Sequence, residues 1–311
     1  MIGITMRHLR YFDALAQHGH FGRAAEACAI SQPALSLQMK ELEDLLGAPL
    51  VERATRQIRL TGLGQAFAAR VRDILRAVDE LEDLARASQG PFAGRLRIGI
   101  IPTAAPYLLP VVMKQLTARF AGLDLRPREA VTQKLIEDLA DGRLDTAIVA
   151  LPVSEPSLEE FLLFEEEFVL VRPHEDADKP VPKPEKLREM RLLLLEEGHC
   201  FRDQALSFCN LSPSQPRDLM EGSSLSTLVQ MVGAGIGVTL IPQMAVPVET
   251  NSAKVSIARF AAPRPSRRIG MVWRKTNPLA PQLTRMAELV RGICSDIAVP
   301  VAAGSEIREA G

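Results

Sequence analysis

Apolar residues near the amino terminus recur at helical spacing in short segments. Residues 9–50 predict consecutive short helices, the second over 21–28 and the third beginning at Ser31. Ser31 is a good N-cap and Pro33 suits the first turn of a helix, so the third helix begins there. One apolar stripe of this helix faces the other helices and consists of Leu35, Met39, Leu42 and Leu46. The pattern predicts a helix-turn-helix.

A second face of the third helix carries polar residues. In a helix-turn-helix, the start of this recognition helix enters the major groove, where Gln and Ser side chains reach base edges or phosphates. The candidates for DNA contact are Gln32, Pro33, Ser36 and Lys40. Gln32 and Ser36 are expected to lie nearest to the bases.

The segment after Gly47 predicts a basic hairpin. Residues 50–60 form two short strands joined by a tight tip, in which Arg53, Arg56 and Arg59 gather positive charge. We expect Arg53 and Arg56 to contact phosphates or a minor groove. The segment alone fits a solvated hairpin equally well, and the neighbouring helix-turn-helix favours a DNA-binding wing.

A long helix capped by Thr61 follows. Its apolar residues alternate by four and three positions over almost three heptads: Phe67, Val71, Ile74, Val78, Leu81 and Ala85. This seam predicts pairing with another helix, most simply in a homodimer. The stretch 88–94, which contains Gly and Pro, ends the helix.

From Leu96 onward, short apolar runs alternate with helical patterns. Strands are predicted at 96–101, 123–126, 146–149, 168–172, 192–195, 238–241 and 269–274, and helices at 107–120, 132–139 and 282–296. The order implies a parallel or mixed sheet covered by helices. The predicted domains are a winged helix-turn-helix (1–61), a linker and dimerisation helix (62–90), a regulatory domain (91–300) and a flexible tail (301–311).

Composition and charge exclude several classes of protein. The apolar runs fall far short of the ~20 residues that a membrane span needs, and no secretory signal is visible, so the cytoplasm is the expected location. A formal net charge of −1 gives no bulk attraction to nucleic acid, so DNA binding must depend on local charges. The four cysteines match neither a secreted disulfide scaffold nor a zinc site, and no metal or cofactor is expected.

Three motifs of the amino-terminal segment are specific. They are Phe21-x-x-Ala24-Ala25, the run from Ser31 to Ser36, and Leu42-Glu43-x-x-Leu46-Gly47-x-x-Leu50. Together they resemble the LysR-type family of bacterial regulators. The resemblance implies an all-α winged helix-turn-helix with a long linker helix, and a carboxy-terminal α/β domain of two subdomains like those of periplasmic binding proteins. It also implies a homodimer, usually a homotetramer, with promoter DNA and RNA polymerase as partners. Leu37 departs from the family, because many members carry a basic residue there.

Residues 198–209 place two cysteines beside side chains that can carry positive charge. His199 or Arg202 could stabilise a thiolate at Cys200, and the thiolate is the form that attacks peroxide. Taken without a family, two buried structural cysteines are slightly favoured. The run Gly198-His199-Cys200-x-Arg202-Asp203-Gln204-Ala205, followed by Cys209, closely resembles the members of the LysR-type family that sense hydrogen peroxide.

The resemblance implies a reversible disulfide. Cys200 is the peroxidatic residue and Cys209 the resolving one, and reductants of the glutaredoxin or thioredoxin type restore the thiols. The implied peroxide pocket contains Thr103, Thr132, His199, Asp203 and Arg267, with Arg268 as an alternative to Arg267. Taken alone, Thr103 and Thr132 are equally well explained as helix N-caps. Cys28 and Cys294 are expected to be core cysteines.

The segment 202–208 predicts a helix. A helix at this place is incompatible with that disulfide. Nine residues at ~1.5 Å rise separate the Cα atoms of Cys200 and Cys209 by roughly 13 Å, whereas a disulfide needs about 4.4–6.8 Å. Bridging must unwind the segment, which supplies the two-state element of a switch.

The implied function is a DNA-binding transcription regulator, mainly an activator of oxidative-stress genes, and not an enzyme. The main alternative is a LysR-type regulator that answers a small organic effector without redox switching. A thiol peroxidase that binds DNA secondarily is a further alternative. A solute-binding protein is disfavoured by the helix-turn-helix and by the absence of a visible secretory signal.

Overall fold

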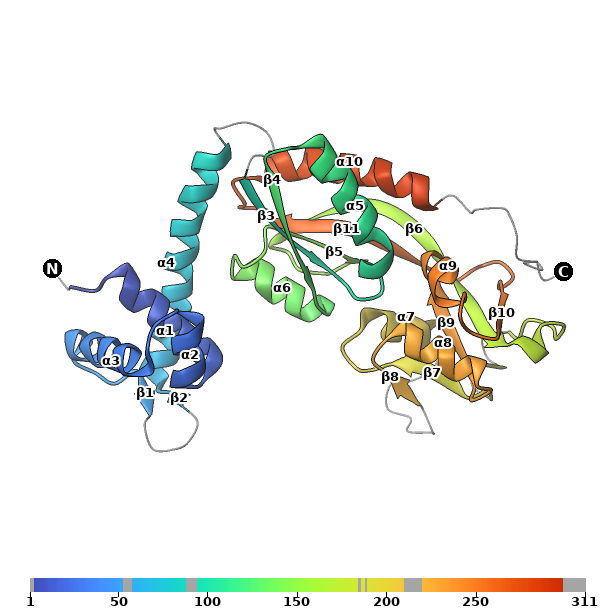
Figure 1. Cartoon of the computed structure of the whole chain (residues 1–311), viewed down its shortest axis with the longest axis horizontal. Helices are drawn as coiled ribbons and strands as arrows, with labels where there is room; N and C mark the ends of the chain where they lie inside the picture. The colour runs from blue at the N-terminus through green and yellow to red at the C-terminus, as the bar shows by residue number, and fades with distance from the viewer. Residues whose placement is uncertain are drawn as a thin grey trace. The chain divides into compact units, whose positions relative to one another are not determined.

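The computed structural model describes residues 3–52, 58–87, 94–183, 186–187, 189–209 and 220–298 (Figure 1). The chain divides into two compact units, Met1–Ala85 and Arg86–Gly311. The tip of the predicted wing, most of the stretch that follows the long helix, and the predicted tail lie outside the described residues.

The first unit is a winged helix-turn-helix, as predicted. Its elements are α1 (Met6–His18), α2 (Phe21–Ala27), α3 (Gln32–Leu46), β1 (Val51–Glu52), β2 (Arg59–Leu60) and α4 (Gly62–Ala87). The Ser31 hydroxyl accepts a hydrogen bond from the backbone N–H of Ala34, which caps α3 as expected. Strands β1 and β2 pair antiparallel and form the base of the wing.

The long helix α4 begins after Thr61, whose hydroxyl accepts a hydrogen bond from the backbone N–H of Gly64. Val71 is fully buried in the core of its own unit, and Phe67 packs against that core. Ile74 and Leu81 are 46% and 64% exposed. The predicted seam is therefore divided: its first residues hold α4 to its own unit, and exposed apolar residues follow.

The second unit contains two hydrophobic cores joined by one nine-stranded sheet. The elements around the first core are β3 (Gly94–Ile100), α5 (Ala105–Arg119), β4 (Leu123–Glu129), α6 (Thr132–Ala140), β5 (Thr146–Leu151), β11 (Ser266–Arg274) and α10 (Ala280–Ala298). Parallel strands β4, β3 and β5 lie side by side, with α5 and α10 on one face and α6 on the other (Figure 1).

The second core is smaller. Its elements are β7 (Leu192–Leu195), α7 (Cys200–Phe208), β8 (Glu221–Gly222), α8 (Leu225–Gly233), β9 (Val238–Pro242), the 3-10 turn η3 (Gln243–Ala245), α9 (Val246–Glu249) and β10 (Val255–Ala258). Two cores in one α/β domain confirm the predicted two-subdomain arrangement. None of the helices in the described ranges has the length and hydrophobicity that a membrane span requires.

The strand β6 (Leu158–Pro173) joins the two cores. Its first part pairs antiparallel with β11, and its last part pairs with β9 and β10. The sequence predicted only 168–172 as a strand, because the preceding part carries five glutamates that hide its strand pattern. Pairing with β11 holds this acidic part in the sheet despite its composition.

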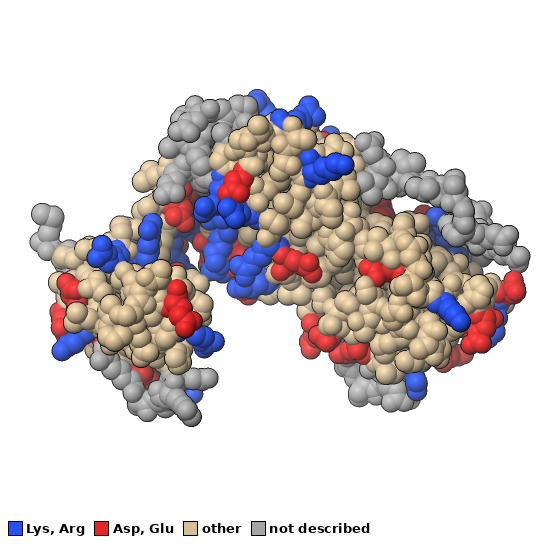
Figure 2. Space-filling model, in the orientation of Figure 1, with Lys and Arg blue, Asp and Glu red and all other residues tan. Residues whose placement is uncertain are grey.

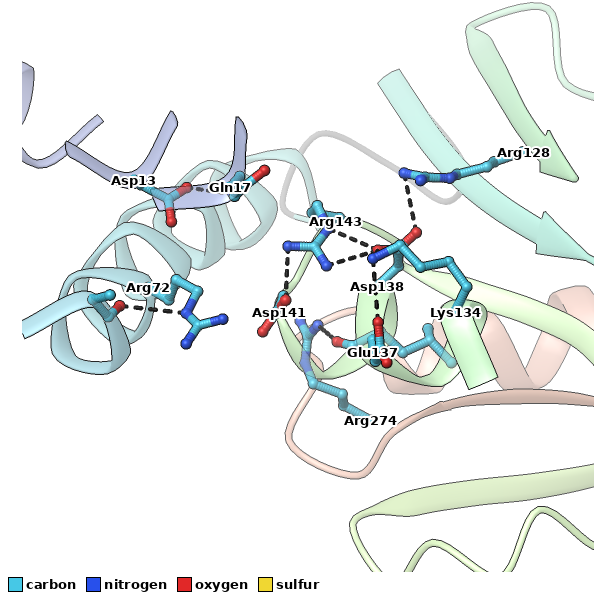
Figure 3. Close-up of polar contacts among 12 residues, drawn as sticks. Asp13, Gln17, Arg72, Arg128, Lys134, Glu137, Asp138, Asp141, Arg143 and Arg274 are labelled. Atoms are coloured by element: carbon cyan, nitrogen blue, oxygen red, sulfur yellow. Dashed lines mark hydrogen bonds and ion pairs between the residues drawn. The ribbon is translucent and has the colours of Figure 1, made fainter. Parts of the chain in front are cut away.

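Helix α6 is held by ion pairs to one buried carboxylate (Figure 3). The Asp138 side chain has no exposed surface, and its oxygens lie 3.0 Å from Arg128 Nη1, 3.4 Å from Lys134 Nζ and 2.7 Å from Arg143 Nη2. A buried carboxylate is stable only when paired in this way. The cluster fixes α6 and therefore the residues at its amino-terminal end.

Replacement of Asp145 should destabilise the fold more than replacement of an exposed aspartate. The buried Asp145 carboxylate accepts bonds from the Arg97 backbone N–H (2.6 Å) and guanidinium (2.6 and 3.2 Å). Asp145→Ala removes the buried acceptor of these bonds and should lower the free energy of unfolding by about 3 kcal/mol in urea titrations. The control is Asp124→Ala, whose partners Arg95 and Arg126 are 63% exposed. Asp124→Ala should lower the free energy of unfolding by less than about 1 kcal/mol. Equal losses in the two variants would contradict the prediction.

Candidate functional site

The start of α3 presents the predicted DNA-contacting residues. Gln32, Pro33 and Lys40 are exposed and Ser36 is half-buried. Leu37 is 65% exposed on the same helix and offers an apolar side chain. The visible face of this unit carries both basic and acidic side chains (Figure 2), in keeping with its nearly balanced charge. Arg53 and Arg56 lie outside the described residues.

Helix α7 carries the two cysteines of the predicted switch at its ends. Gly198, with φ +97°, turns the chain after β7, and Cys200 is the first residue of the helix. Cys200 is half-buried and Cys209 fully buried, and neither cysteine is in a disulfide. The predicted helix is confirmed, and it extends over the whole segment between the thiols. The first turn of a helix has unpaired N–H groups, which favour negative charge at its first residue.

Cys200 lies at the boundary of the two cores. It packs against the first core, whereas Phe201, Ala205 and Cys209 belong to the second. The Phe201 ring meets Phe168 edge to face at 4.8 Å. A change in α7 therefore disturbs the packing between the subdomains.

Arg202 anchors the first turn of α7. Its guanidinium donates to the carbonyl of Leu195 at 2.8 Å and to Glu221 at 2.5 Å. The sequence suggested Arg202 as a cation for the Cys200 thiolate, but its charge is compensated by Glu221 and its donors fasten the helix to β7 and β8. Arg202 thus has a structural role in this conformation.

His199 precedes the helix and is half-buried. Burial lowers the pKa of His199 below its ordinary value of 6.5, although Glu196 and Glu129 oppose that shift. The imidazole is therefore neutral near pH 7. It supplies hydrogen-bonding nitrogens beside Cys200 rather than a positive charge.

Thr103 and Arg267 form a buried pair at the end of β3. Arg267 Nη1 donates to the Thr103 hydroxyl at 2.7 Å, and Nη2 donates to the Thr103 carbonyl at 3.1 Å. Both residues are 3% exposed. Arg268 is exposed, so of the two alternatives only Arg267 points inward. The Arg267 guanidinium lies 5.4 Å from the centre of the Phe201 ring, next to Cys200 in the chain.

Thr132 is the first residue of α6, and its hydroxyl is buried without a hydrogen-bond partner among the described residues. Neither Thr132 nor Thr103 caps a helix, because Val131 and Ala104 are the N-cap residues of α6 and α5. The N-cap explanation of both threonines is therefore wrong. A buried hydroxyl without a partner is expected where a ligand or water completes the site.

Other predicted residues have different surroundings. Asp203 is exposed in the first turn of α7 and makes no hydrogen bond or ion pair with another described residue. Cys294 is fully buried in the first core, and burial raises the pKa of its thiol to about 12, as expected of a core cysteine. Cys28 is only half-buried and follows α2, so its assignment to the core is wrong. Burial and Asp13 raise the pKa of the Cys28 thiol.

The sequence did not indicate Glu166, which binds Arg267. Glu166 Oε1 accepts a hydrogen bond from Arg267 Nε at 2.7 Å and lies 2.6 Å from Nη2 in an ion pair. The two residues are directly opposite each other on β6 and β11 but lie 101 positions apart in the chain. The only signal was a run of three glutamates, which usually marks a solvated surface.

Two family models match the chain. Residues 6–65 match the bacterial regulatory helix-turn-helix protein of the lysR family, and residues 89–295 match the LysR substrate binding domain. The two matches coincide with the helix-turn-helix unit and with the domain of two cores.

Individual relatives align over nearly the full length. A probable hydrogen peroxide-inducible genes activator of Streptomyces viridosporus is 43% identical over 302 residues, 96% of each chain. The DNA-binding transcriptional dual regulator OxyR of Escherichia coli is 39% identical over 290 residues, 93% of this chain and 95% of the relative. A solved structure of a Corynebacterium glutamicum OxyR mutant, with hydrogen peroxide bound, is 34% identical with a TM-score of 0.65, and 94% of each chain is covered.

The lowered pKa of His199 predicts a pH dependence of stability. As the pH falls through 6.5, the unfolded chain takes up a proton that the folded chain resists, so the free energy of unfolding decreases. Above that pH both states are neutral at this residue and the effect is absent. Urea titrations at pH 7.5 and 5.5 should show a larger loss for the wild type than for His199→Gln. The same loss in both proteins would contradict the prediction.

Proposed function

The chain belongs to the LysR family of bacterial helix-turn-helix regulators, and we propose that it changes transcription in response to hydrogen peroxide through a reversible Cys200–Cys209 disulfide. The observation that carries the proposal is the placement of Cys200, a half-buried free thiol at the first position of α7 and at the boundary of two cores. Relatives named as hydrogen peroxide-inducible genes activators support it.

The first step is oxidation of Cys200. Its thiolate attacks one oxygen of hydrogen peroxide, the S–O bond forms as the O–O bond breaks, and the other oxygen leaves as hydroxide, which takes up a proton to become water. Cys200 is oxidised to a sulfenic acid and the peroxide is reduced. In the second step the Cys209 thiol loses its proton and attacks the Cys200 sulfur; the S–S bond forms as the S–O bond breaks, and the sulfenic oxygen leaves as hydroxide, which takes up that proton to become water.

The second step must dismantle α7. Cys209 is fully buried in the second core, and a nine-residue helical separation of ~13 Å prevents the two sulfurs from bonding. Unwinding removes the contact of Phe201 with Phe168 on β6 and the bonds of Arg202 to β7 and β8. Repacking at the boundary of the two cores is the signal that reaches the rest of the protein.

The proposed peroxide site contains Thr103, Thr132, His199, Asp203 and Arg267. The unpartnered hydroxyl of Thr132 and the Thr103–Arg267 pair supply hydrogen bonds to a small polar ligand. Neutral His199 stands beside Cys200, and Asp203, one turn into α7, assists the second step.

The remaining parts have assigned roles in this proposal. Residues 1–61 bind promoter DNA through α3 and the wing, and the wing contributes Arg53 and Arg56. Residues 62–90 form the dimer linker, and residues 91–300 form the domain that senses peroxide. The exposed Ile74 and Leu81 of α4 suit a homodimer, and contacts between regulatory domains complete a homotetramer. The protein acts in the cytoplasm, activates RNA polymerase and is reset by glutaredoxin- or thioredoxin-type reductants. It is a sensor and not an enzyme, because it reacts once per reduction.

One equivalent of hydrogen peroxide should produce a Cys200–Cys209 disulfide in the reduced protein. Intact mass should fall by about two hydrogens, and peptide mapping without added thiols should find the linked peptides. Cys209→Ser should stop at the sulfenic acid, and Cys200→Ser should not respond. Both variants should still bind DNA, since neither residue lies in the helix-turn-helix unit.

Other outcomes would separate the alternatives. Unmodified cysteines after peroxide treatment would refute the redox switch and direct the search to an organic effector. Continuous consumption of many equivalents of peroxide per protein, as long as a reductant is supplied, would identify a thiol peroxidase. Loss of DNA binding in Cys200→Ser would assign this cysteine a folding role.

Replacement of Lys40 should weaken DNA binding without changing sequence preference. Lys40 is an exposed cation on α3, and a phosphate contact releases counterions on binding. Lys40→Ala should reduce the slope of log affinity against log salt by about 1 in fluorescence anisotropy. Gln32→Ala should instead reduce the preference for the specific site. As a control, Lys179→Ala removes a 68% exposed lysine from the regulatory domain and should change neither quantity. An unchanged slope for Lys40→Ala would remove this residue from the interface.

A further inference from the structure

Glu166 and Arg267 form a buried ion pair where β6 passes from one core to the other. The two residues are 7% and 3% exposed. They are cross-strand partners near the end of the β6–β11 ladder, and from Phe168 onward β6 pairs with β9 instead. The pair therefore lies at the junction of the subdomains.

The surroundings of Glu166 fix its carboxylate on both sides. Oε1 accepts a hydrogen bond from Arg267 Nε at 2.7 Å and lies 2.6 Å from Nη2 in an ion pair, and Oε2 accepts from the backbone N–H of Met244 at 3.3 Å. Met244 lies in η3, directly after β9. A buried ion pair is stable when its remaining lone pairs are also used, as they are here. The Arg267 guanidinium is thereby held in one orientation above the Phe201 ring.

This orientation determines which hydrogen atoms face Thr103. A guanidinium has five N–H hydrogens. Nε donates to Glu166, Nη2 makes an ion-pair contact with Glu166, and Nη1 and Nη2 each donate one hydrogen to Thr103, so the second hydrogen on Nη1 has no acceptor among the described residues. That hydrogen is on the same nitrogen that donates to the Thr103 hydroxyl at 2.7 Å. Because the hydroxyl oxygen accepts from Arg267, its own hydrogen points elsewhere and is a second donor.

Two adjacent donors suit an oxygen atom that gains negative charge. When the O–O bond of peroxide breaks, the leaving oxygen takes the electron pair and becomes hydroxide. Preorganised donors aimed at such an oxygen stabilise the transition state more than the bound reactant. The Glu166–Arg267 pair has no net charge, so it provides these donors to an uncharged ligand without attracting anions.

We propose that Glu166 is a positioning residue of the peroxide site: by holding Arg267, it directs the free Nη1–H and the Thr103 O–H at the oxygen that leaves from peroxide. The inference rests on the proposed peroxide reaction of Cys200. Glu166 acts only through Arg267 and does not touch the reactant. A role confined to fold stability is the alternative that the experiment must separate.

The experiment compares two reactions of Cys200 in a full-length Cys209→Ser background. Hydrogen peroxide oxidises Cys200, and iodoacetamide alkylates it. Both rates are followed on the Cys200 peptide by quenched-flow mass spectrometry, with the sulfenic acid trapped by dimedone. Alkylation and its pH profile report the thiolate, whereas only the peroxide reaction needs donors for a leaving oxygen.

Glu166→Gln should lower the ratio of the peroxide rate to the alkylation rate by about 10- to 100-fold. The amide has one oxygen, so it cannot accept from both Arg267 and Met244. Glu166→Asp keeps the charge, should fold if the glutamine variant does not, and should give a smaller decrease. As a matched control, Glu167→Gln, on the same strand and 38% exposed, should leave the ratio unchanged. In an Arg267→Gln background, Glu166→Gln should cause no further decrease.

The outcomes distinguish the inference from the proposed function. An unchanged ratio in folded Glu166→Gln and Glu166→Asp, with fast wild-type oxidation, would overturn the positioning role alone. A further decrease of the ratio in the Arg267→Gln background would also overturn it, because Glu166 would then act independently of Arg267. Wild-type Cys200 reacting with peroxide no faster than free cysteine would overturn the proposed function and this inference with it.

Discussion

The helix between Cys200 and Cys209 is the constraint on which the rest of the site depends. As long as α7 is intact, the two thiols occupy opposite ends of a rigid element and cannot bond. The anchors of that helix, namely the Arg202 bonds and the Phe201 packing, are therefore also what holds the reduced state. Oxidation of Cys200 changes the fold in the proposed mechanism because the disulfide can form only if these contacts of α7 are broken.

The strand β6 crosses between the cores and connects a change in α7 with the rest of the domain. β6 contributes to both parts of the sheet, and β11 pairs with it along its first part. The contacts among Thr103, Arg267 and Glu166 connect the turn after β3 with β11, β6 and the turn after β9. The Phe201 ring of α7 lies against the Arg267 guanidinium, so a change in α7 and a change at Arg267 are not independent.

The sequence predicted most elements whose signals are local. Ser31 caps a helix in its own neighbourhood, and residues 192–195 form an uninterrupted apolar strand, so both were visible in the pattern. The role of Glu166 was not, because its partner Arg267 is distant in the chain and becomes a neighbour only through the β6–β11 register. Thr103 failed as an N-cap for the same reason: a distant guanidinium, rather than the next turn of helix, binds its hydroxyl.

The complete burial of Cys209 also affects how fast a disulfide can follow oxidation of Cys200. In the proposed reaction, a sulfenic acid at the half-buried Cys200 cannot reach the buried Cys209 thiol until α7 opens locally. The opening frequency of one short helix then sets a delay between detection and commitment. If a reductant removes the sulfenic acid within that delay, a brief exposure leaves no trace, whereas a sustained exposure does. In the proposed mechanism, the packing of the nine residues of α7 therefore sets this delay.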